Sequence, residues 1–120
     1  MKLGYLEKFK AIDTLLLIGS VEDYLLLYSS VEEFLQSGTA TFELHNEDYV
    51  DAQSDARLYF SKGIVDDTLE FQLDCSRVDV LSMILGIQRN AASCHQYADL
   101  HNTEVQLLFS MGEYDDTVFS

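Results

Sequence analysis

Hydrophobic positions near the start of the chain form a short unbroken run and then a spaced pattern. The run at 14–18 (TLLLI) predicts a buried strand, although the first turn of a helix fits so few residues equally well. Ser20, followed by Glu22 and Asp23, is typical of a helix start with Ser20 as the cap. The 24–28 segment fits either the helix predicted next, at 30–37, or a strand before it.

A helix over 30–37 is the clearest local prediction. Ser30 and Glu33 have the spacing of a capping box, in which the two side chains bond free backbone N–H groups at the helix start. Gly38 follows at the place where such a helix would end. These three residues together predict both ends of the helix.

Alternation replaces the helical period after residue 38. Residues 39–44 (TATFEL) alternate and are rich in strand-forming side chains, so they predict a strand. The polar 45–55 segment is expected to be a loop, with His45 in solvent.

Two further strands are predicted at 57–60 and 68–74, joined through a turn at 61–67. In the second of them the apolar side chains all share one face and the polar side chains share the other. That alternation is typical of a half-solvated antiparallel sheet.

The last third of the chain predicts a helix over about 77–91 and, from weaker patterns, strands at 103–109 and 117–119. The elements together predict an α+β fold for a single domain spanning 1–120. We expect an antiparallel sheet of about four to five strands with two or three helices packed on one face.

Acidic residues dominate the charge of the chain, with 21 Asp and Glu against 7 Lys and Arg and a formal net charge of −14. Neither 11–56 nor 90–120 contains any Lys or Arg, and we expect these two segments to form a one-sided acidic face. Such a field attracts basic proteins and repels nucleic acids and anionic membranes, so neither of these is an expected partner.

No stretch is long and apolar enough for a membrane helix, and charged residues interrupt the first ten positions where a secretion signal would be continuous. We therefore expect a cytoplasmic protein. In that reducing compartment Cys75 and Cys94 are expected to be free thiols near the core, with a disulfide between them as the alternative.

Catalytic and metal-binding motifs are missing from the sequence, so we expect no enzymatic activity, no cofactor and no metal. The densest group of potential metal ligands is Cys94, His95, Asp99 and His101, but its spacing matches no zinc motif. We expect these residues to lie on a helix end or loop, with Cys94 packed inward.

Acidic residues interleaved with tyrosines are the feature that remains, and aromatic rings surrounded by carboxylates suit a protein interface. With this composition, length and α+β pattern, the chain resembles the small acidic immunity proteins of bacterial toxin systems, such as those of nuclease colicins, barstar and contact-dependent growth inhibition. The resemblance is at the level of the class and rests on no family motif. It implies an inhibitor that binds and neutralises a basic toxin, often a nuclease, as a monomer or weak dimer.

The predicted partner-binding residues fall in three acidic segments of the chain. In order of preference they are Glu47, Asp48, Tyr49, Asp51 and Asp55; then Tyr114, Asp115 and Asp116; then Glu32 and Glu33. Two alternatives stay open: a nucleic-acid mimic that inhibits a DNA- or RNA-binding protein, and a non-enzymatic regulatory or adaptor subunit.

Overall fold

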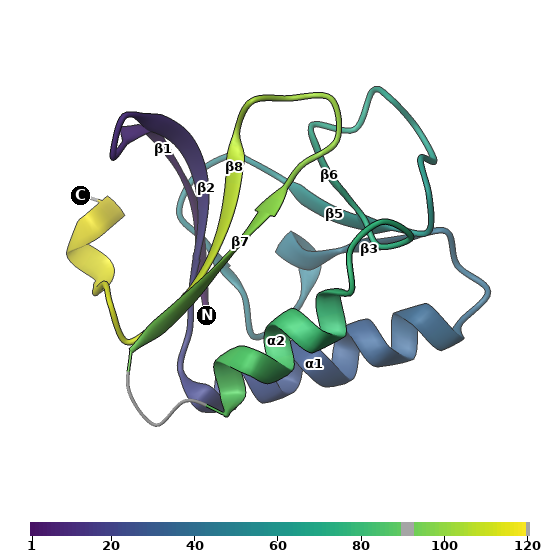
Figure 1. Ribbon diagram of the computed structural model, residues 1–120, viewed down its shortest axis with the longest axis horizontal. Helices are drawn as coiled ribbons and strands as arrows, with labels where there is room; N and C mark the ends of the chain where they lie inside the picture. The colour runs from purple at the N-terminus through teal and green to yellow at the C-terminus, as the bar shows by residue number, and fades with distance from the viewer. Residues whose placement is uncertain (90–92, 120) are drawn as a thin grey trace.

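The computed structural model describes residues 1–89 and 93–119 and contains eight strands in two sheets together with two α-helices. The predicted α+β class is confirmed. In Figure 1 the helices lie side by side along one side of the molecule, below the strands of both sheets. Among the described residues, no helix is long and apolar enough to cross a membrane.

The larger sheet has five strands in the order β4-β1-β2-β8-β7. Their bounds are β1 (Lys2–Phe9), β2 (Ile12–Ile18), β4 (Asp51–Ala52), β7 (Cys94–Asp99) and β8 (Gln106–Met111). β1 pairs with β2, and β7 with β8, in antiparallel fashion, whereas β2 and β8 run parallel at the centre. Residues 14–17 of β2 and 107–111 of β8 are all buried, which explains why the 14–18 run is almost continuously apolar.

The smaller sheet has the order β3-β5-β6, with β3 (Thr41–Glu43), β5 (Leu58–Ser61) and β6 (Phe71–Asp74). The antiparallel pairing predicted for the last two strands is wrong, because β5 and β6 are parallel. The 62–70 connection folds back over β6 and covers its polar face: Val65 N–H donates to Gln72 Oε1 (3.2 Å), and Gly63 N–H donates to Asp74 Oδ1 (3.0 Å). Side chains that were expected in solvent are therefore buried.

Helix α1 (Val21–Gln36) is one continuous helix, so the helix predicted at 30–37 is only its second half. The capping box is formed by Ser20 and Asp23, and Ser30 lies inside the helix rather than at its start. The buried stripe of Tyr24, Leu27, Val31 and Phe34 keeps helical spacing straight through Ser30, so burial in the core extends the helix past the second cap signal.

Helix α2 (Val80–Gln88) begins at Asp79, whose side chain caps it by accepting a hydrogen bond from the Ser82 N–H. The predicted helix started three residues earlier, and its predicted end at 90–91 lies outside the described residues. Tyr24 of α1 joins the helical layer to the larger sheet, because its buried hydroxyl donates to the carbonyls of Leu17 (3.0 Å) and Ser110 (2.8 Å).

The sequence patterns missed β1 and misassigned both ends of the 94–119 region. The 94–99 stretch is the edge strand β7 rather than a loop or helix end. The strand predicted at 117–119 is wrong, because η2 (Asp116–Phe119) is a 3₁₀ turn. The ring of Phe119 lies against Gly4 of β1, where a Cβ would come within 2.4 Å of it, so this glycine makes room for the turn.

Candidate functional site

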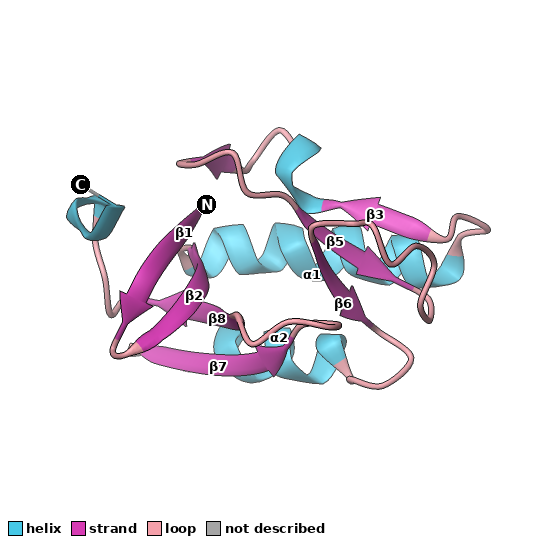
Figure 2. Cartoon of the chain, turned by 90° about the horizontal axis from the view of Figure 1, so that it is seen from above, coloured by secondary structure: helices cyan, strands magenta, loops and turns pink. Residues whose placement is uncertain are grey.

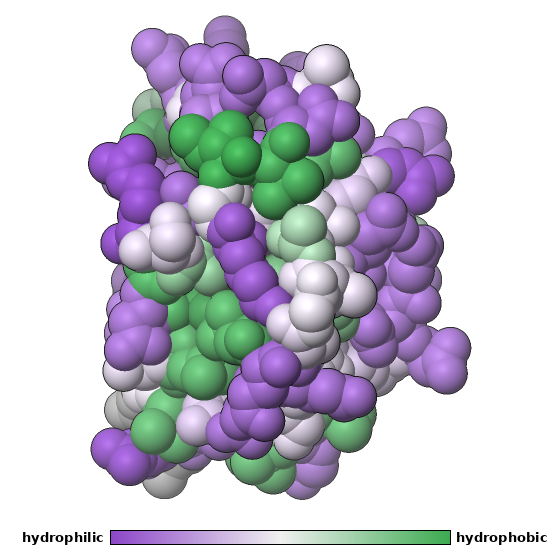
Figure 3. Space-filling model, turned by 90° about the vertical axis from the view of Figure 1, so that its right-hand side faces the viewer, coloured by the Kyte–Doolittle hydropathy of each residue, from purple (hydrophilic) through white to green (hydrophobic). Residues whose placement is uncertain are grey.

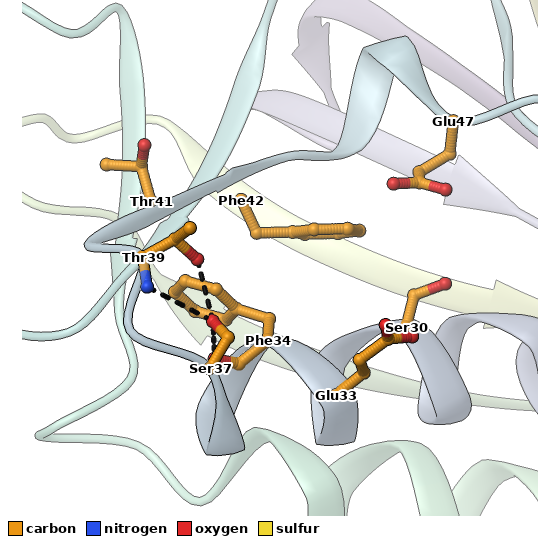
Figure 4. A pocket seen from close by; sticks show the side chains of 8 residues that line it. All are labelled: Ser30, Glu33, Phe34, Ser37, Thr39, Thr41, Phe42 and Glu47. Atoms are coloured by element: carbon orange, nitrogen blue, oxygen red, sulfur yellow. Dashed lines mark hydrogen bonds between the residues drawn. The ribbon is translucent and has the colours of Figure 1, made fainter.

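A pocket of about 320 Å³ opens between α1 and the segment that follows it, and it joins two of the predicted acidic segments. Figure 4 shows Ser30, Glu33, Phe34 and Ser37 rising from α1, while Glu47 points toward the same space from the other side. The lining residues are Ser30, Glu33, Phe34, Ser37, Thr39, Thr41, Phe42 and Glu47.

Aromatic rings form the apolar part of the pocket. Phe34 and Phe42 have ring centroids 5.9 Å apart and are tilted by 34° to each other. Phe42 also stacks on Phe60 at 5.7 Å, which anchors it to β5. The rings are therefore held in place by the core while one part of the Phe42 ring stays accessible.

Hydroxyl groups line the pocket around the C-terminal end of α1. The Ser37 hydroxyl donates to the Phe34 carbonyl (2.7 Å) and contacts the Thr39 hydroxyl (2.7 Å), so these groups close the last turn of the helix. Lys62 lies beside them. Its ammonium group is 4.9 Å from the centroid of Phe34 and donates to the Ser37 carbonyl.

Glu33 and Glu47 supply the charge of the pocket, and none of the eight lining residues is basic. Glu33 is exposed and shares a helix face with Ser30 and Ser37, since these three residues are three and four positions apart. Glu47 is half-buried. Loss of solvent raises the pKa of the Glu47 carboxyl, and the charges of Asp48 and Glu33 raise it further.

Tyr49 lies behind the pocket rather than in it. Its hydroxyl donates to the Ser30 hydroxyl (3.0 Å), and burial raises the pKa of Tyr49 to about 12. Asp48, between Glu47 and Tyr49, is exposed. Of these three residues of the first predicted group, only Glu47 lines the pocket, Asp48 is its exposed neighbour, and Tyr49 packs behind the pocket against Ser30.

Asp51 and Asp55 lie away from this pocket. Asp51 is exposed on β4, and its backbone N–H donates to the Met1 carbonyl (2.8 Å) at the edge of the larger sheet. Asp55 lines a separate hollow beside Tyr5 and Phe71. Glu32 is exposed on α1 next to Glu33, but it does not line the pocket.

The C-terminal acidic segment lies at the opposite end of the molecule from β3, as both Figure 1 and Figure 2 show. Tyr114 packs edge-on against Phe9 (5.3 Å), and the Lys10 ammonium lies 5.6 Å from its ring centroid. Asp115 is exposed and accepts hydrogen bonds from Thr117, while the side chain of Asp116 lies outside what the structure describes. The structure therefore separates the C-terminal acidic residues from the pocket, and the predicted one-sided acidic face is wrong.

His45 is buried, contrary to the prediction that it lies in solvent. It belongs to the 3₁₀ turn η1 (Leu44–Asn46), its side chain is 5% exposed, and neither ring nitrogen makes a hydrogen bond within the described residues. Loss of solvent lowers the pKa of His45, and the nearby Arg57 lowers it further, against the opposing charge of Glu43.

Potential metal ligands are dispersed over the described residues, and no three His, Cys, Asp or Glu side chains come together there to hold an ion. His95 pairs with Glu113 (2.7 Å), while His101 pairs with Asp67 (2.9 Å). Cys75 and Cys94 are free thiols, as expected, and both are partly buried. Burial raises the pKa of Cys75 to about 11.

The sequence patterns missed the aromatic and hydroxyl residues of the pocket. The patterns place Phe34 in a helix and Phe42 in a strand without a further role, and they predict Ser30 to be a helix cap. Their assembly depends on how the 37–40 connection turns β3 back along α1, which no local pattern reports.

A scan against protein-family models, a search of curated proteins and a search of solved structures each found no match to this chain. The kind of ligand that the pocket could bind is therefore inferred from the residues that line it. Two carboxylates, several hydroxyls and an aromatic surface suit a cation that also carries apolar surface.

Proposed function

We propose that this chain is an inhibitor of the immunity-protein kind, which binds and neutralises a basic bacterial toxin, most simply a nuclease, through its acidic surface. The observation that carries the proposal is the meeting of Glu33 and Glu47 at one aromatic pocket whose lining holds no basic residue. The net charge of −14 steers a basic partner toward the surface, and the pocket gives it a specific place to bind.

Apolar surface lies at the same end of the molecule as the pocket, in the 62–70 connection. Figure 3 views this end and shows apolar areas among hydrophilic side chains. Ile64 and Val65 of this loop are 53% and 44% exposed. Lys62 of the same loop bonds the Ser37 carbonyl beside the pocket, so apolar and acidic surface are close neighbours. This combination supports a protein partner.

Co-expression with the product of the adjacent gene tests the proposal. We expect the two proteins to purify as a complex at low salt, and we expect cells that produce the neighbouring protein to grow only when this chain is present. The proposal is wrong if the neighbouring product is harmless to cells in the absence of this chain, or if it stays toxic and unbound when the two are produced together.

A further inference from the structure

We propose that the Glu33/Glu47 pocket binds the guanidinium group of one arginine side chain of the basic partner. This inference rests on the proposed function and deepens it, because it names the chemical group that the acidic surface recognises. It is carried by the shape and lining of the cavity together with a cation contact that the chain already makes there.

The size of the pocket suits one side chain. Its volume of about 320 Å³ is at the lower end of the roughly 300–1,000 Å³ found for small-molecule sites. An extended side chain with a charged tip fits such a space, whereas a folded domain or a nucleic acid strand does not. The partner would therefore insert a single residue.

The lining favours a guanidinium over an ammonium group. A guanidinium is planar, carries five N–H donors in a fixed fork and stacks on aromatic rings, while an ammonium is a compact and strongly hydrated charge. The pocket offers carboxylates on two sides, hydroxyl acceptors between them and the half-buried ring of Phe42, which packs against the buried Phe34. These groups match a flat donor fork.

Lys62 shows that this aromatic wall accepts a cation. Its ammonium group already lies 4.9 Å from the centroid of Phe34 and is held by the Ser37 carbonyl. Lys62 does not line the pocket, and the Glu33 and Glu47 carboxylates face the remaining space. A guanidinium entering there would pair with both carboxylates, and its positive charge would offset the loss of solvent and the charges of Asp48 and Glu33 that raise the pKa of Glu47.

Titration of the full chain with N-acetyl-arginine amide, followed by NMR at low salt, tests the inference. We expect saturable shifts confined to residues 30–47, with a dissociation constant of roughly millimolar order. N-acetyl-lysine amide should bind several-fold more weakly. E33Q/E47Q should weaken arginine binding about tenfold or more, while E32Q/D48N, which removes the same charge at neighbouring exposed positions, should change it less than about twofold.

Several outcomes overturn the inference. Equal binding of the two amides removes the preference for arginine, and equal loss in the two double variants means that net charge alone attracts the probe. Shifts scattered over the whole surface have the same meaning. Amide spectra of both variants without ligand establish that each is folded before the comparison is made.

The failure of this inference is distinguishable from failure of the proposed function. If a basic partner binds the wild-type chain and both double variants with equal affinity, the arginine pocket is wrong and the inhibitor proposal stands. If the adjacent gene product neither binds nor harms cells, the proposed function is wrong whatever the arginine probe does.

Discussion

The side chain of His45 is only 5% exposed, and its lowered pKa couples the stability of the fold to pH. Arg57, Glu43 and Glu70 are the charged groups whose fields act on it, and Tyr59 packs edge-on against it at 5.3 Å. The pKa of His45 in the folded state lies below its ordinary value of 6.5. The unfolded chain therefore binds the proton more readily than the folded one.

The sign of the effect follows from this difference. The contribution of neutral His45 to stability is complete above pH 6.5 and is lost as the pH falls from there toward the lower pKa of the folded state. We expect His45→Phe to reduce the fall in the free energy of unfolding between pH 6.5 and pH 5, measured by urea denaturation. At pH 7 the substitution should be close to neutral, because two ring nitrogens that make no hydrogen bond to the described residues are replaced by an apolar ring.

If the pH profile of His45→Phe between pH 6.5 and pH 5 is indistinguishable from that of the wild-type chain, His45 is not the group that couples stability to pH.

Glu47 is a proposed binding residue whose carboxylate costs stability. Since its folded-state pKa is raised, the ionised form is less favourable in the folded protein, and stability falls as the pH rises from the ordinary value of 4.5 through the raised one. Glu47→Gln should therefore raise the free energy of unfolding at pH 7, whereas Glu32→Gln, at an exposed position outside the pocket, should change it less. A loss of stability in Glu47→Gln, measured by urea denaturation, would contradict this reading.

At the scale of elements, Tyr24 is the hydrogen-bonded joint between α1 and the larger sheet. Tyr24→Phe removes a buried hydroxyl from two carbonyls while keeping the ring, so we expect a loss of about 1 kcal/mol in the free energy of unfolding. Tyr28→Phe is the matched control on the same helix, because the Tyr28 hydroxyl makes no hydrogen bond to the described residues. Equal effects of the two substitutions would show that the Tyr24 hydroxyl is not a structural joint.

The start of α1 gives a second test at this scale. Ser20→Ala removes the cap and should cost about 1 kcal/mol, because the Asp23 N–H loses its acceptor. Ser29→Ala, on the exposed side of the same helix, should be neutral or slightly stabilising, since alanine has the higher helix propensity. Thermal unfolding of both variants, followed by circular dichroism, measures the difference, and a Ser20→Ala variant as stable as Ser29→Ala would contradict the assigned helix start.

Local signals predicted most of these elements but not how they pair. The apolar run of β2, the Ser20 cap of α1 and the alternation in β3 could be predicted, because each depends on neighbours in sequence, whereas the predicted start of α2 was three residues too early. β1 was missed because its turn is made by Lys10 and Ala11 at φ of 50° and 74°, where a glycine or asparagine would have signalled it. The parallel pairing of β5 with β6 depends on the path of the 62–70 connection, which buries polar side chains that alternation places in solvent.

At the scale of the whole molecule, the excess of acidic residues is evident from the sequence, but the predicted position of these residues on one face is wrong. The pocket beside β3 and the C-terminal acidic residues lie at opposite ends of the molecule, although β2 and β8 of the two segments without basic residues pair at the centre of the larger sheet. Lys10 lies against Tyr114 at the C-terminal end. Glu33 and Glu47 come together only because the chain turns back after α1. A pocket formed in this way can be identified from the tertiary structure but not from the number of charged residues in each segment.

Long-range attraction should dominate the rate at which a basic partner is captured. With −14 net charge, we expect the association rate constant to fall steeply between low salt and about 0.5 M salt, while the dissociation rate constant changes less, because salt screens long-range fields more than close contacts. Surface plasmon resonance with the co-purified partner measures both rate constants. An association rate constant that is insensitive to salt would contradict electrostatic steering.

The affinity of two charge-matched variants for that co-purified partner tests the central claim most directly. E33Q/E47Q and E32Q/D48N remove the same two charges from neighbouring positions, but only the first pair empties the pocket of carboxylates. The account predicts that E33Q/E47Q weakens partner binding about tenfold or more, a loss of about 1.4 kcal/mol, while E32Q/D48N weakens it less than about threefold. Equal weakening by the two variants, or none by either, would contradict the account.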